Sequence, residues 1–211
     1  MKIIKLNLKN RSYNIIVGNK IITSLGKCLA RLNAGGDAYI ITNASIKNKY
    51  GAILNKTLKE SGFQTKFKLI PDSEKSKSIE TASLLLKDLA LYDKKRRIFI
   101  IALGGGVVGD LAGFIASVYK RGVPYVQVPT TLLAQVDSSI GGKTAVDLIW
   151  GKNLVGVLYQ PRLVFSDVCL LKTLDLKQLR AGLAEVIKYG VIKDASLFNY
   201  LEKNFQDILT L

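Results

Sequence analysis

Histidine is absent from the 211 residues of the chain, and cysteine occurs only twice, as Cys28 and Cys169. Without histidine, no metal site built within this chain can use imidazole ligands. Two cysteines in separate apolar segments are too few for a disulfide framework or a cysteine metal cluster. We therefore predict that both are plain buried thiols.

Long apolar runs are also missing, and none approaches the roughly 18–20 uninterrupted residues that a membrane-spanning helix needs. The first ten residues, MKIIKLNLKN, alternate charged and apolar side chains, which indicates a strand and not a signal peptide. With 48% hydrophobic and 22% charged residues, the composition is that of a globular protein. These features predict no membrane partner and a cytoplasmic location.

Acidic residues are comparatively few, so the formal net charge is +15. The lysines and arginines are nevertheless spread over nearly every segment, and the one basic run, DKKRR at 93–97, comes just before a predicted strand. A solvated turn is the simplest interpretation of that run, and no aromatic-rich motif accompanies it, which argues against nucleic acid as a partner. Scattered positive charge suits small anionic ligands equally well, because it raises their concentration at the surface.

What the sequence does contain is a regular alternation of short apolar runs and longer segments of helical period. Strands are predicted near residues 4–8, 13–17, 37–43, 63–69, 98–104, 124–131 and 162–168, and helices near 21–32, 46–62, 79–89 and after Asp110. An irregular, glycine-rich region separates the last two strands. Alternation of this kind predicts an α/β fold with a Rossmann-like, mostly parallel sheet and helices on both faces.

From about Leu176 the pattern is wholly helical, and the chain stops in the middle of the second helix of this part, with no cap and no polar tail. We expect an α/β domain over residues 1–175 and, over 176–211, the beginning of an all-helical domain that is cut short.

Glycines mark the most informative junction, where the buried strand IFIIALG runs into a helix. Gly104, Gly106 and Gly109 match the spacing G-x-G-x-x-G, which lets backbone N–H groups at a helix N-terminus approach a pyrophosphate. The motif follows a late strand, however, and no acidic residue stands about 20 positions further on to bind a ribose. A tight turn with Asp110 as the capping residue is the alternative interpretation.

Polar side chains accumulate in the segments that follow. VPTTLLAQVDSSIGGKTAVD (128–147) offers threonine hydroxyls, an aspartate and a lysine, and GKNLVG (151–156) adds a lysine and an asparagine. Glu185 and Lys188 are three residues apart, hence on one helix face, where a surface ion pair is the ordinary interpretation. Together these groups suit a substrate with several hydroxyl and anionic groups.

Four of these segments, PDSEKSKS, LGGGVVGDLAGFIASVYKRGVPYVQVPTTLLAQVDSSIGGKTAVD, GKNLVGVLYQP and GLAEVIKYG, closely resemble the 3-dehydroquinate synthase family. The resemblance runs in order from about residue 40 to the end of the chain. It implies an NAD-dependent lyase that cyclises 3-deoxy-D-arabino-heptulosonate 7-phosphate to 3-dehydroquinate with loss of phosphate. NAD would take a hydride from the C5 hydroxyl and later return it, with a divalent metal, zinc or cobalt, as second cofactor.

The resemblance also implies roles for individual residues. For NAD it implies Asn43, Asp72, Glu74, Lys75, Gly105, Gly106, Val107, Asp110, Thr130, Thr131, Lys143, Lys152, Leu170 and Thr173. For substrate chemistry it implies Asp137, Lys143, Lys152, Asn153, Lys188 and, from the second subunit of a homodimer, Arg121. Glu185 matches a metal ligand whose two companions in the family are histidines, so the chain alone is expected to be inactive.

Two other functions remain open on the sequence alone. A related sugar-phosphate cyclase, or a polyol dehydrogenase of the same architecture, would share the glycine motif, although GGGVVGD and DSSIGGKTAVD favour 3-dehydroquinate synthase. A non-enzymatic basic binding module would show a salt-dependent interaction with DNA and none with NAD.

Overall fold

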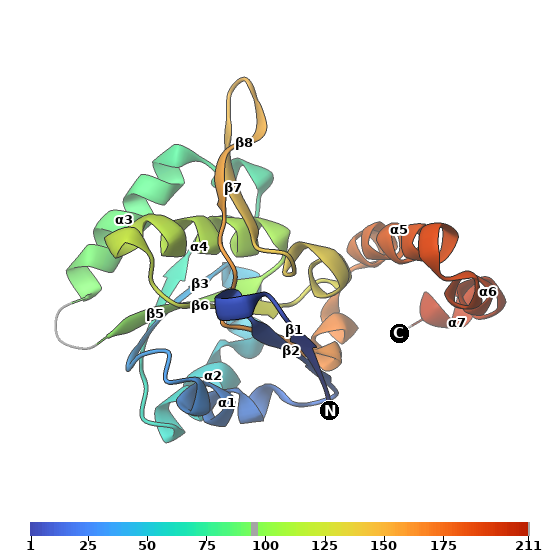
Figure 1. Cartoon of the computed structure of the whole chain (residues 1–211), viewed down its shortest axis with the longest axis horizontal. Coiled ribbons are helices and arrows are strands. Elements are labelled where there is room, and N and C mark those ends of the chain that lie inside the picture. Colours follow the sequence, from blue (N-terminus) through green and yellow to red (C-terminus); the bar gives the residue numbers. More distant parts are fainter. Residues whose placement is uncertain (94–96, 211) are drawn as a thin grey trace.

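A computed structural model describes residues 1–93 and 97–210 of the chain. Its centre is a seven-stranded sheet in the order β1-β2-β9-β6-β5-β3-β4 (Figure 1). Within the described residues β1 is antiparallel to β2, and the other neighbouring strands are parallel, as predicted. The strands are β1 (Lys2–Leu6), β2 (Tyr13–Gly18), β3 (Asp37–Thr42), β4 (Gln64–Leu69), β5 (Ile98–Gly104), β6 (Tyr125–Pro129) and β9 (Leu163–Asp167).

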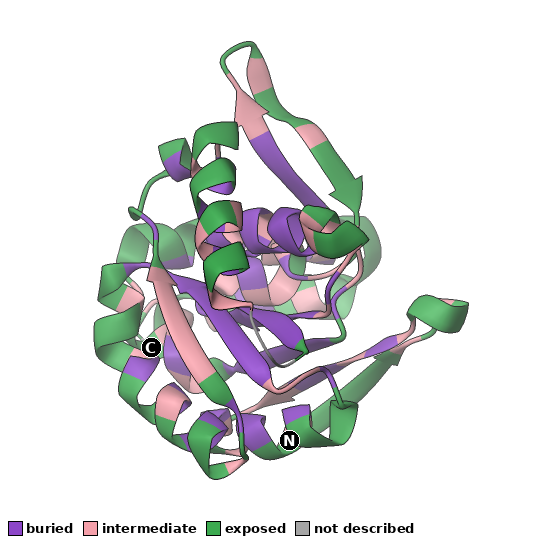
Figure 2. Ribbon diagram, turned by 90° about the vertical axis from the view of Figure 1, so that its left-hand side faces the viewer, coloured by how far each residue is buried: buried purple, intermediate pink, exposed green. Residues whose placement is uncertain are grey.

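Helices cover both faces of this sheet, which confirms the predicted α/β class. On one face, α1 and α2 pack Leu29 and Leu58 against the sheet, while α3 and α4 pack Leu89 and Leu111 against the other. All seven residues of β5 are buried, and Figure 2 shows the central strands in purple between helices with green outer faces. The helices are α1 (Leu25–Leu32), α2 (Ala44–Glu60), α3 (Ile79–Tyr92), α4 (Gly106–Val118), α5 (Leu176–Lys193), α6 (Ala195–Lys203) and α7 (Phe205–Ile208).

The glycine-rich region between the last two strands is more regular than the sequence indicated. It contains a π-helical turn, Ala134–Ser138, and then a two-stranded hairpin of β7 (Lys143–Leu148) and β8 (Gly151–Leu158). The hairpin stands out from the sheet (Figure 1). Glycine at 156 resembles a loop signal, but it is needed inside the strand, because a β-carbon there would lie 2.3 Å from the carbonyl oxygen of Thr144.

The helix after the glycine motif begins earlier than expected. Its first residue is Gly106, so Asp110 lies inside α4 and does not cap it, contrary to the alternative interpretation of the motif. Asp110 instead forms an ion pair with Lys77 at 2.5 Å. By contrast, α3 has a side-chain cap, because Ser78 Oγ accepts a hydrogen bond from Thr81 N at 3.2 Å.

The last three helices extend away from the sheet (Figure 1). The last helix predicted from the sequence is two helices, α6 and α7, because the helical conformation is interrupted at Asn204. Several large apolar side chains of this region are exposed, among them Val191 at 68% and Ile192 at 71%. None of the described helices is both long enough and apolar enough to cross a membrane.

The cysteines and the basic run differ from the rest of the predicted features. The cysteines Cys28 and Cys169 are free, as predicted, but both are half-buried, so the prediction that they are buried was wrong. Cys169 lies in a short 3₁₀ segment outside the sheet, and its thiol donates to Asn19 Oδ1 at 2.6 Å in an exposed contact. Most of the basic run at 93–97 lies outside the described residues, since residues 94–96 are not among them.

Candidate active site

A cleft of about 350 Å³ lies at the carboxyl ends of the parallel strands; we call it the strand-end cleft. It lies at a switch point of the sheet, because β4 flanks β3 on one side while β6 flanks β5 on the other. Open α/β sheets bind ligands at such points. Nine of the predicted NAD-binding residues line this cleft: Asn43, Asp72, Glu74, Gly105, Gly106, Val107, Thr130, Thr131 and Thr173.

The first turn of α4 presents bare backbone to the strand-end cleft. Its N-cap is Gly105, which offers no side chain to the free N–H groups of the turn. A β-carbon on Gly105 would lie 3.1 Å from Thr131 Cγ2, and one on Gly106 would lie 3.2 Å from Ser138 Oγ. Glycine therefore keeps this space open, and the helix dipole adds partial positive charge to it. The turn fits a phosphoryl or pyrophosphate group.

Two hydroxyls beside this turn have no hydrogen-bond partner among the described residues. Thr130 is 2% exposed and lines the strand-end cleft, and its Oγ1 is buried and unpaired. Ser138 Oγ, next to Gly106, is also buried and unpaired. Buried hydroxyls almost always have a partner. A ligand with acceptor oxygens at the first turn of α4 would supply one.

The opposite wall of the strand-end cleft is formed by α2 and the 3₁₀ segment Val168–Thr173. Asn43 caps α2, since its Oδ1 accepts a hydrogen bond from Ile46 N at 2.8 Å, which leaves the side-chain NH₂ available to a ligand. Tyr50 joins the two elements: its hydroxyl lies 2.7 Å from Thr173 Oγ1 and donates to the Leu170 carbonyl at 3.1 Å.

Leu170 has a different position from the one its predicted role suggests. Its side chain is 3% exposed and packs in the core beneath the cleft, so it supports the wall without lining it. Tyr50 and Lys49 line the cleft instead, and sequence reasoning missed both. The sequence could have indicated them only through their spacing from Asn43, which places them on the face of α2 that borders the cleft.

A second cavity, of about 530 Å³, lies between the hairpin, α4 and the π-helical turn; we call it the hairpin cavity. Four predicted residues line it, namely Asp110, Asp137, Lys143 and Asn153. The rest of its wall is largely the apolar face of β8, including Leu154 and Val157. Charged groups along an apolar wall suit a small polar ligand that is anionic at one end and hydroxylated elsewhere.

Lys77 connects the elements that surround the hairpin cavity. Its side chain is 6% exposed, and its Nζ donates to Asp110 Oδ2 at 2.5 Å and to Asn153 Oδ1. Burial raises the pKa of Asp110, and the hydrogen bond from Lys77 opposes that rise. The Lys77 carbonyl also accepts from Asp147 N, at 2.7 Å. Lys77 was not predicted, because nothing in PDSEKSKS distinguishes the one buried lysine.

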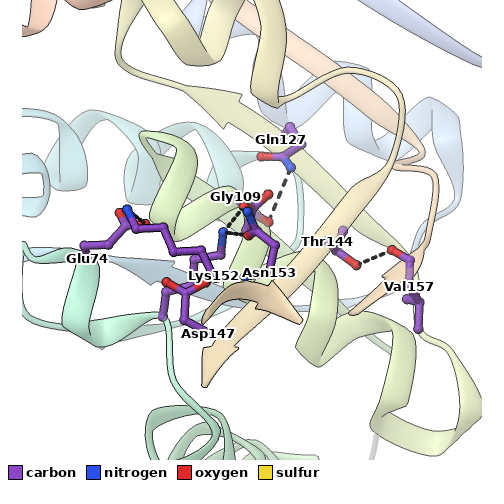
Figure 3. A network of polar contacts seen from close by, with 10 residues as sticks. Glu74, Gly109, Gln127, Thr144, Asp147, Lys152, Asn153 and Val157 are labelled. Atoms are coloured by element: carbon purple, nitrogen blue, oxygen red, sulfur yellow. Dashed lines mark hydrogen bonds and ion pairs between the residues drawn. The ribbon is translucent and has the colours of Figure 1, made fainter. Parts of the chain in front are cut away.

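Lys75, which was predicted to contact NAD, is exposed and lines a separate hollow below the hairpin tip. Lys152 pairs with Glu74 at 3.1 Å, and both side chains are largely exposed. Figure 3 shows these two residues beside Asp147 and Asn153, next to α4. The ion pair thus links the hairpin to a residue of the strand-end cleft.

Asn153 is held in an unusual conformation. Its φ is +58°, a left-handed value that asparagine tolerates better than most residues. Its backbone N–H donates to Asp147 Oδ1 at 2.7 Å, and its side-chain oxygen accepts from Lys77. The start of β8 therefore presents the asparagine amide to the cavity in a fixed position.

Helix α5 reaches the hairpin cavity through Tyr189. The Tyr189 hydroxyl lies 3.1 Å from Asp137 Oδ1, to which it donates. Burial raises the pKa of Tyr189 well above its ordinary value, and the carboxylates of Glu185 and Asp137 add to this effect. Close packing of Gly182 against Leu132 and Leu133 fixes α5 beside the π-helical turn, because a β-carbon at 182 would lie 2.6 Å from Leu132 Cβ.

Glu185 and Lys188 form the ion pair that their spacing predicted. The hydrogen bond from Lys188 lowers the pKa of Glu185. No group of three or more His, Cys, Asp or Glu side chains that could hold a metal ion occurs in the part of the chain that the structure describes. An ordinary catalytic metal site has three protein ligands, and the described residues around Glu185 provide fewer than three. They do not by themselves fit a metal ion.

Arg121 lies at the far end of α4. A helix of 13 residues is about 20 Å long, and Arg121 follows its last residue, Val118, by three positions. The residue is exposed, has a φ of +62° and lines neither cavity. Within a single chain it therefore does not meet the other predicted substrate residues.

Comparison with known proteins gives consistent results. The family model described as 3-dehydroquinate synthase N-terminal matches residues 67–181. A curated relative, the 3-dehydroquinate synthase of Desulforamulus reducens, is 49% identical over 212 residues, which cover all of this chain and 59% of that protein. The chain thus spans about three fifths of the length of the curated relatives it matches.

Solved structures of sugar-phosphate-type synthases are among those that share the fold. The 2-epi-5-epi-valiolone synthase of Streptomyces hygroscopicus subsp. jinggangensis, with NAD⁺ and Zn²⁺ bound, has a TM-score of 0.85 and 32% identity, covering 97% of this chain and 56% of that one. A 2-deoxy-scyllo-inosose synthase complexed with carbaglucose-6-phosphate, NAD⁺ and Co²⁺ has a TM-score of 0.81 and 28% identity, covering 89% and 50%.

Proposed function

Because the chain belongs to the 3-dehydroquinate synthase family, we propose that it is the NAD-binding part of an enzyme that converts 3-deoxy-D-arabino-heptulosonate 7-phosphate to 3-dehydroquinate. Residues 1–175 would bind NAD, and 176–211 would belong to a helical region that contributes to substrate and metal binding. The observation that carries the proposal is the arrangement of the two cavities. A backbone cradle for a pyrophosphate adjoins a charged cavity on the same helix, α4.

The strand-end cleft supports NAD as the cofactor. The first turn of α4, with Gly105, Gly106 and Val107, would hold the pyrophosphate, and Thr130 would give its unpaired hydroxyl to the same group. The side-chain NH₂ of Asn43 would donate from the opposite wall. When bound there, NAD supplies a reversible hydride acceptor for oxidation and re-reduction of a substrate alcohol.

The hairpin cavity supports a sugar-phosphate substrate. Lys143 would stabilise phosphate or carboxylate oxygens, and Asp137 and Asn153 would bind hydroxyl groups. Lys152 does not line the cavity, and from the adjoining hairpin, where it pairs with Glu74, it would add a second cation. Tyr189 holds Asp137 from α5, so the carboxylate is fixed before substrate arrives. Charge-assisted hydrogen bonds of this kind orient the substrate, and each contributes about 1.5–3 kcal/mol.

A divalent metal, zinc or cobalt, belongs to the proposal only for the longer enzyme. Glu185 would be one ligand, and Lys188 a substrate ligand on the same helix face. The described residues do not complete the donor set, so no chemical step is assigned to a metal in this chain. We expect no phosphate release from the heptulosonate phosphate by the chain alone, even with NAD and zinc or cobalt.

A homodimer is also part of the proposal. Arg121 is exposed and remote from both cavities of its own chain, as a residue that completes the partner's site would be. The cytoplasmic location stays a prediction, as does the absence of nucleic acid and membrane partners.

Isothermal titration of NAD into the chain tests the proposal. A saturable heat at submillimolar NAD is expected, with a rise in melting temperature that depends on NAD concentration. No heat and no thermal shift at millimolar NAD would contradict it. A salt-dependent band shift with duplex DNA, without any response to NAD, would favour the basic binding module instead.

A related sugar-phosphate cyclase is the second candidate, favoured by the 28–32% identity to the two cyclases that were crystallised with NAD⁺. The affinity of the chain for sugar phosphates, measured in the presence of NAD, distinguishes the two candidate functions. A preference for the heptulosonate 7-phosphate over a hexose 6-phosphate supports 3-dehydroquinate synthase, and the reverse order supports the cyclase. Product identification by mass spectrometry and NMR on an intact enzyme decides the reaction; NADH accumulation with a simple polyol would indicate a dehydrogenase.

A further inference from the structure

Ser138 lines the hairpin cavity, and its hydroxyl lies next to Gly106, which lines the strand-end cleft. It is the last residue of the π-helical turn, and it lines the hairpin cavity beside Asp110 and Asp137. Its hydroxyl oxygen is buried and has no hydrogen-bond partner among the described residues. A buried hydroxyl without a protein partner is unfavourable, and one that also borders a cavity, as this one does, is available to a ligand group.

The position of this hydroxyl indicates which ligand. A β-carbon built on Gly106 would lie 3.2 Å from Ser138 Oγ. Since a C–C bond is about 1.5 Å long, the hydroxyl lies within about 5 Å of the Gly106 α-carbon. Gly106 is the first residue of α4, whose free N–H groups have no side-chain cap. An anion held by those N–H groups has oxygens within reach of the serine hydroxyl.

We propose that Ser138 Oγ donates a hydrogen bond to the pyrophosphate of a dinucleotide bound at the first turn of α4. Thr130 would contact the same pyrophosphate from the opposite side. The inference rests on the proposed function and extends it to a residue outside the glycine motif. Thr130 approaches the first turn of α4 from the strand-end cleft, whereas Ser138 approaches it from the hairpin cavity. The pyrophosphate would then be clamped between two hydroxyls that are unpaired without it.

The test compares Ser138→Ala with Ser139→Ala in the full chain. Ser139 is a matched control, because it is the adjacent serine, is 3% exposed and also has a buried Oγ without a described partner, but lines neither cavity. Dissociation constants for NAD and ADP are measured by isothermal titration, since both ligands contain the pyrophosphate and only NAD carries nicotinamide. The melting temperature of each ligand-free variant is measured alongside.

Ser138→Ala is expected to weaken the binding of NAD and of ADP by the same factor, about tenfold. Ser139→Ala should change either affinity by less than about twofold. The ligand-free Ser138→Ala protein should melt no lower than the parent, because the hydroxyl it loses has no protein partner. Unchanged affinities, or a loss for NAD without a loss for ADP, would overturn the assignment to the pyrophosphate. A parent chain that binds neither ligand would refute the proposed function itself.

Discussion

The strand-end cleft and the hairpin cavity share α4, yet different chemical groups line them. The strand-end cleft meets its ligand with backbone N–H groups, glycines and short hydroxyls, and its essential feature is empty space before Gly105 and Gly106. The hairpin cavity is lined by charged side chains, and Lys77 holds one of them, Asp110, together with Asn153. One site is defined mainly by shape and the other mainly by charge.

This difference determines how each site fails. A site made of backbone loses function when an added side chain fills it, while the fold around it persists. A site made of buried charges fails when one partner is removed, because the remaining charge is left without compensation in a poorly solvated position. Substitutions in the two cavities should therefore separate loss of binding from loss of stability.

Lys77→Met should have the largest effect. The change removes the cation whose side chain is 6% exposed and leaves Asp110, 21% exposed, without its ion-pair partner. We expect the free energy of unfolding to fall by about 3 kcal/mol, and the melting temperature by roughly 6–12 °C. Lys75→Met is the control, because Lys75 is exposed. Similar melting of the two variants, measured by circular dichroism, would contradict the role assigned to Lys77.

Gly106→Val should strongly weaken NAD binding while it changes the stability of the fold little. The valine side chain would enter the space beside Ser138 Oγ, 3.2 Å from the β-carbon position, and block access to the first turn of α4. NAD affinity is expected to fall at least about tenfold, or 1.4 kcal/mol, with unfolding free energy changed by no more than about 1 kcal/mol. Gly51→Ala on α2 is the control, since its β-carbon meets chiefly the flexible Lys47 side chain. Retention of NAD binding by Gly106→Val would refute the cradle.

Asp88 supplies a reference network that touches neither cavity. Burial alone would raise its pKa, but hydrogen bonds from Lys66, Tyr39 and Lys68 outweigh burial and hold the pKa of Asp88 at about 2. Because the folded pKa is below the ordinary 3.8, the stabilisation is present above about pH 4 and is lost as pH falls from about 4 to about 2.

Asp88→Asn should therefore flatten the decline of unfolding free energy over that window, by about 1 kcal/mol after allowance for solvent screening. Urea unfolding at pH 2, 3, 4 and 5 measures the slope. Asp72→Asn, at an exposed carboxylate, should keep the parent slope. An Asp88→Asn slope equal to that of the parent would show that the network carries no such pH dependence.

Lys152→Ala should have the smallest effect on stability. The Lys152 and Glu74 side chains are 70% and 48% exposed, and exposed ion pairs contribute about 0–1 kcal/mol. The melting temperature should move by no more than about 2 °C, as with Lys56→Ala, which breaks an exposed pair with Glu60. In an intact enzyme the same change should reduce turnover clearly. A thermal loss as large as that of Lys77→Met would place Lys152 in the structural framework instead.

The sequence was sufficient where local pattern and tertiary structure agree. Period-two and helical runs located the parallel strands and their helices, and the glycine motif located the junction of β5 and α4, although α4 begins at Gly106 and not after Asp110. It was insufficient where burial contradicts residue type. Lys77 is a buried lysine within a polar segment, and Gly156 is a strand glycine that resembles a loop residue. Such positions are determined by contacts between distant segments.

The candidate site was predicted better at its main chain than at its side chains. Nine of the residues proposed for NAD line the strand-end cleft, because strand ends and a helix start determine where they lie. Five others do not: Lys75 faces solvent, Leu170 faces the core, and Asp110, Lys143 and Lys152 lie at or beside the hairpin cavity. Ser138 was missed because an unpaired hydroxyl becomes informative only when its neighbours are known.

The segment 71–77 has a thermodynamic consequence for the two ligands. Asp72 and Glu74 line the strand-end cleft, while Lys77 holds Asp110 and Asn153 of the hairpin cavity, and its carbonyl bonds Asp147 N. A ligand in either cavity that stabilises one arrangement of this segment changes the binding free energy of the other ligand. Linkage requires the effect to be reciprocal: the factor by which the first ligand alters the affinity of the second equals the factor in the opposite direction. Order of addition can then change the path to the ternary complex, but not its free energy.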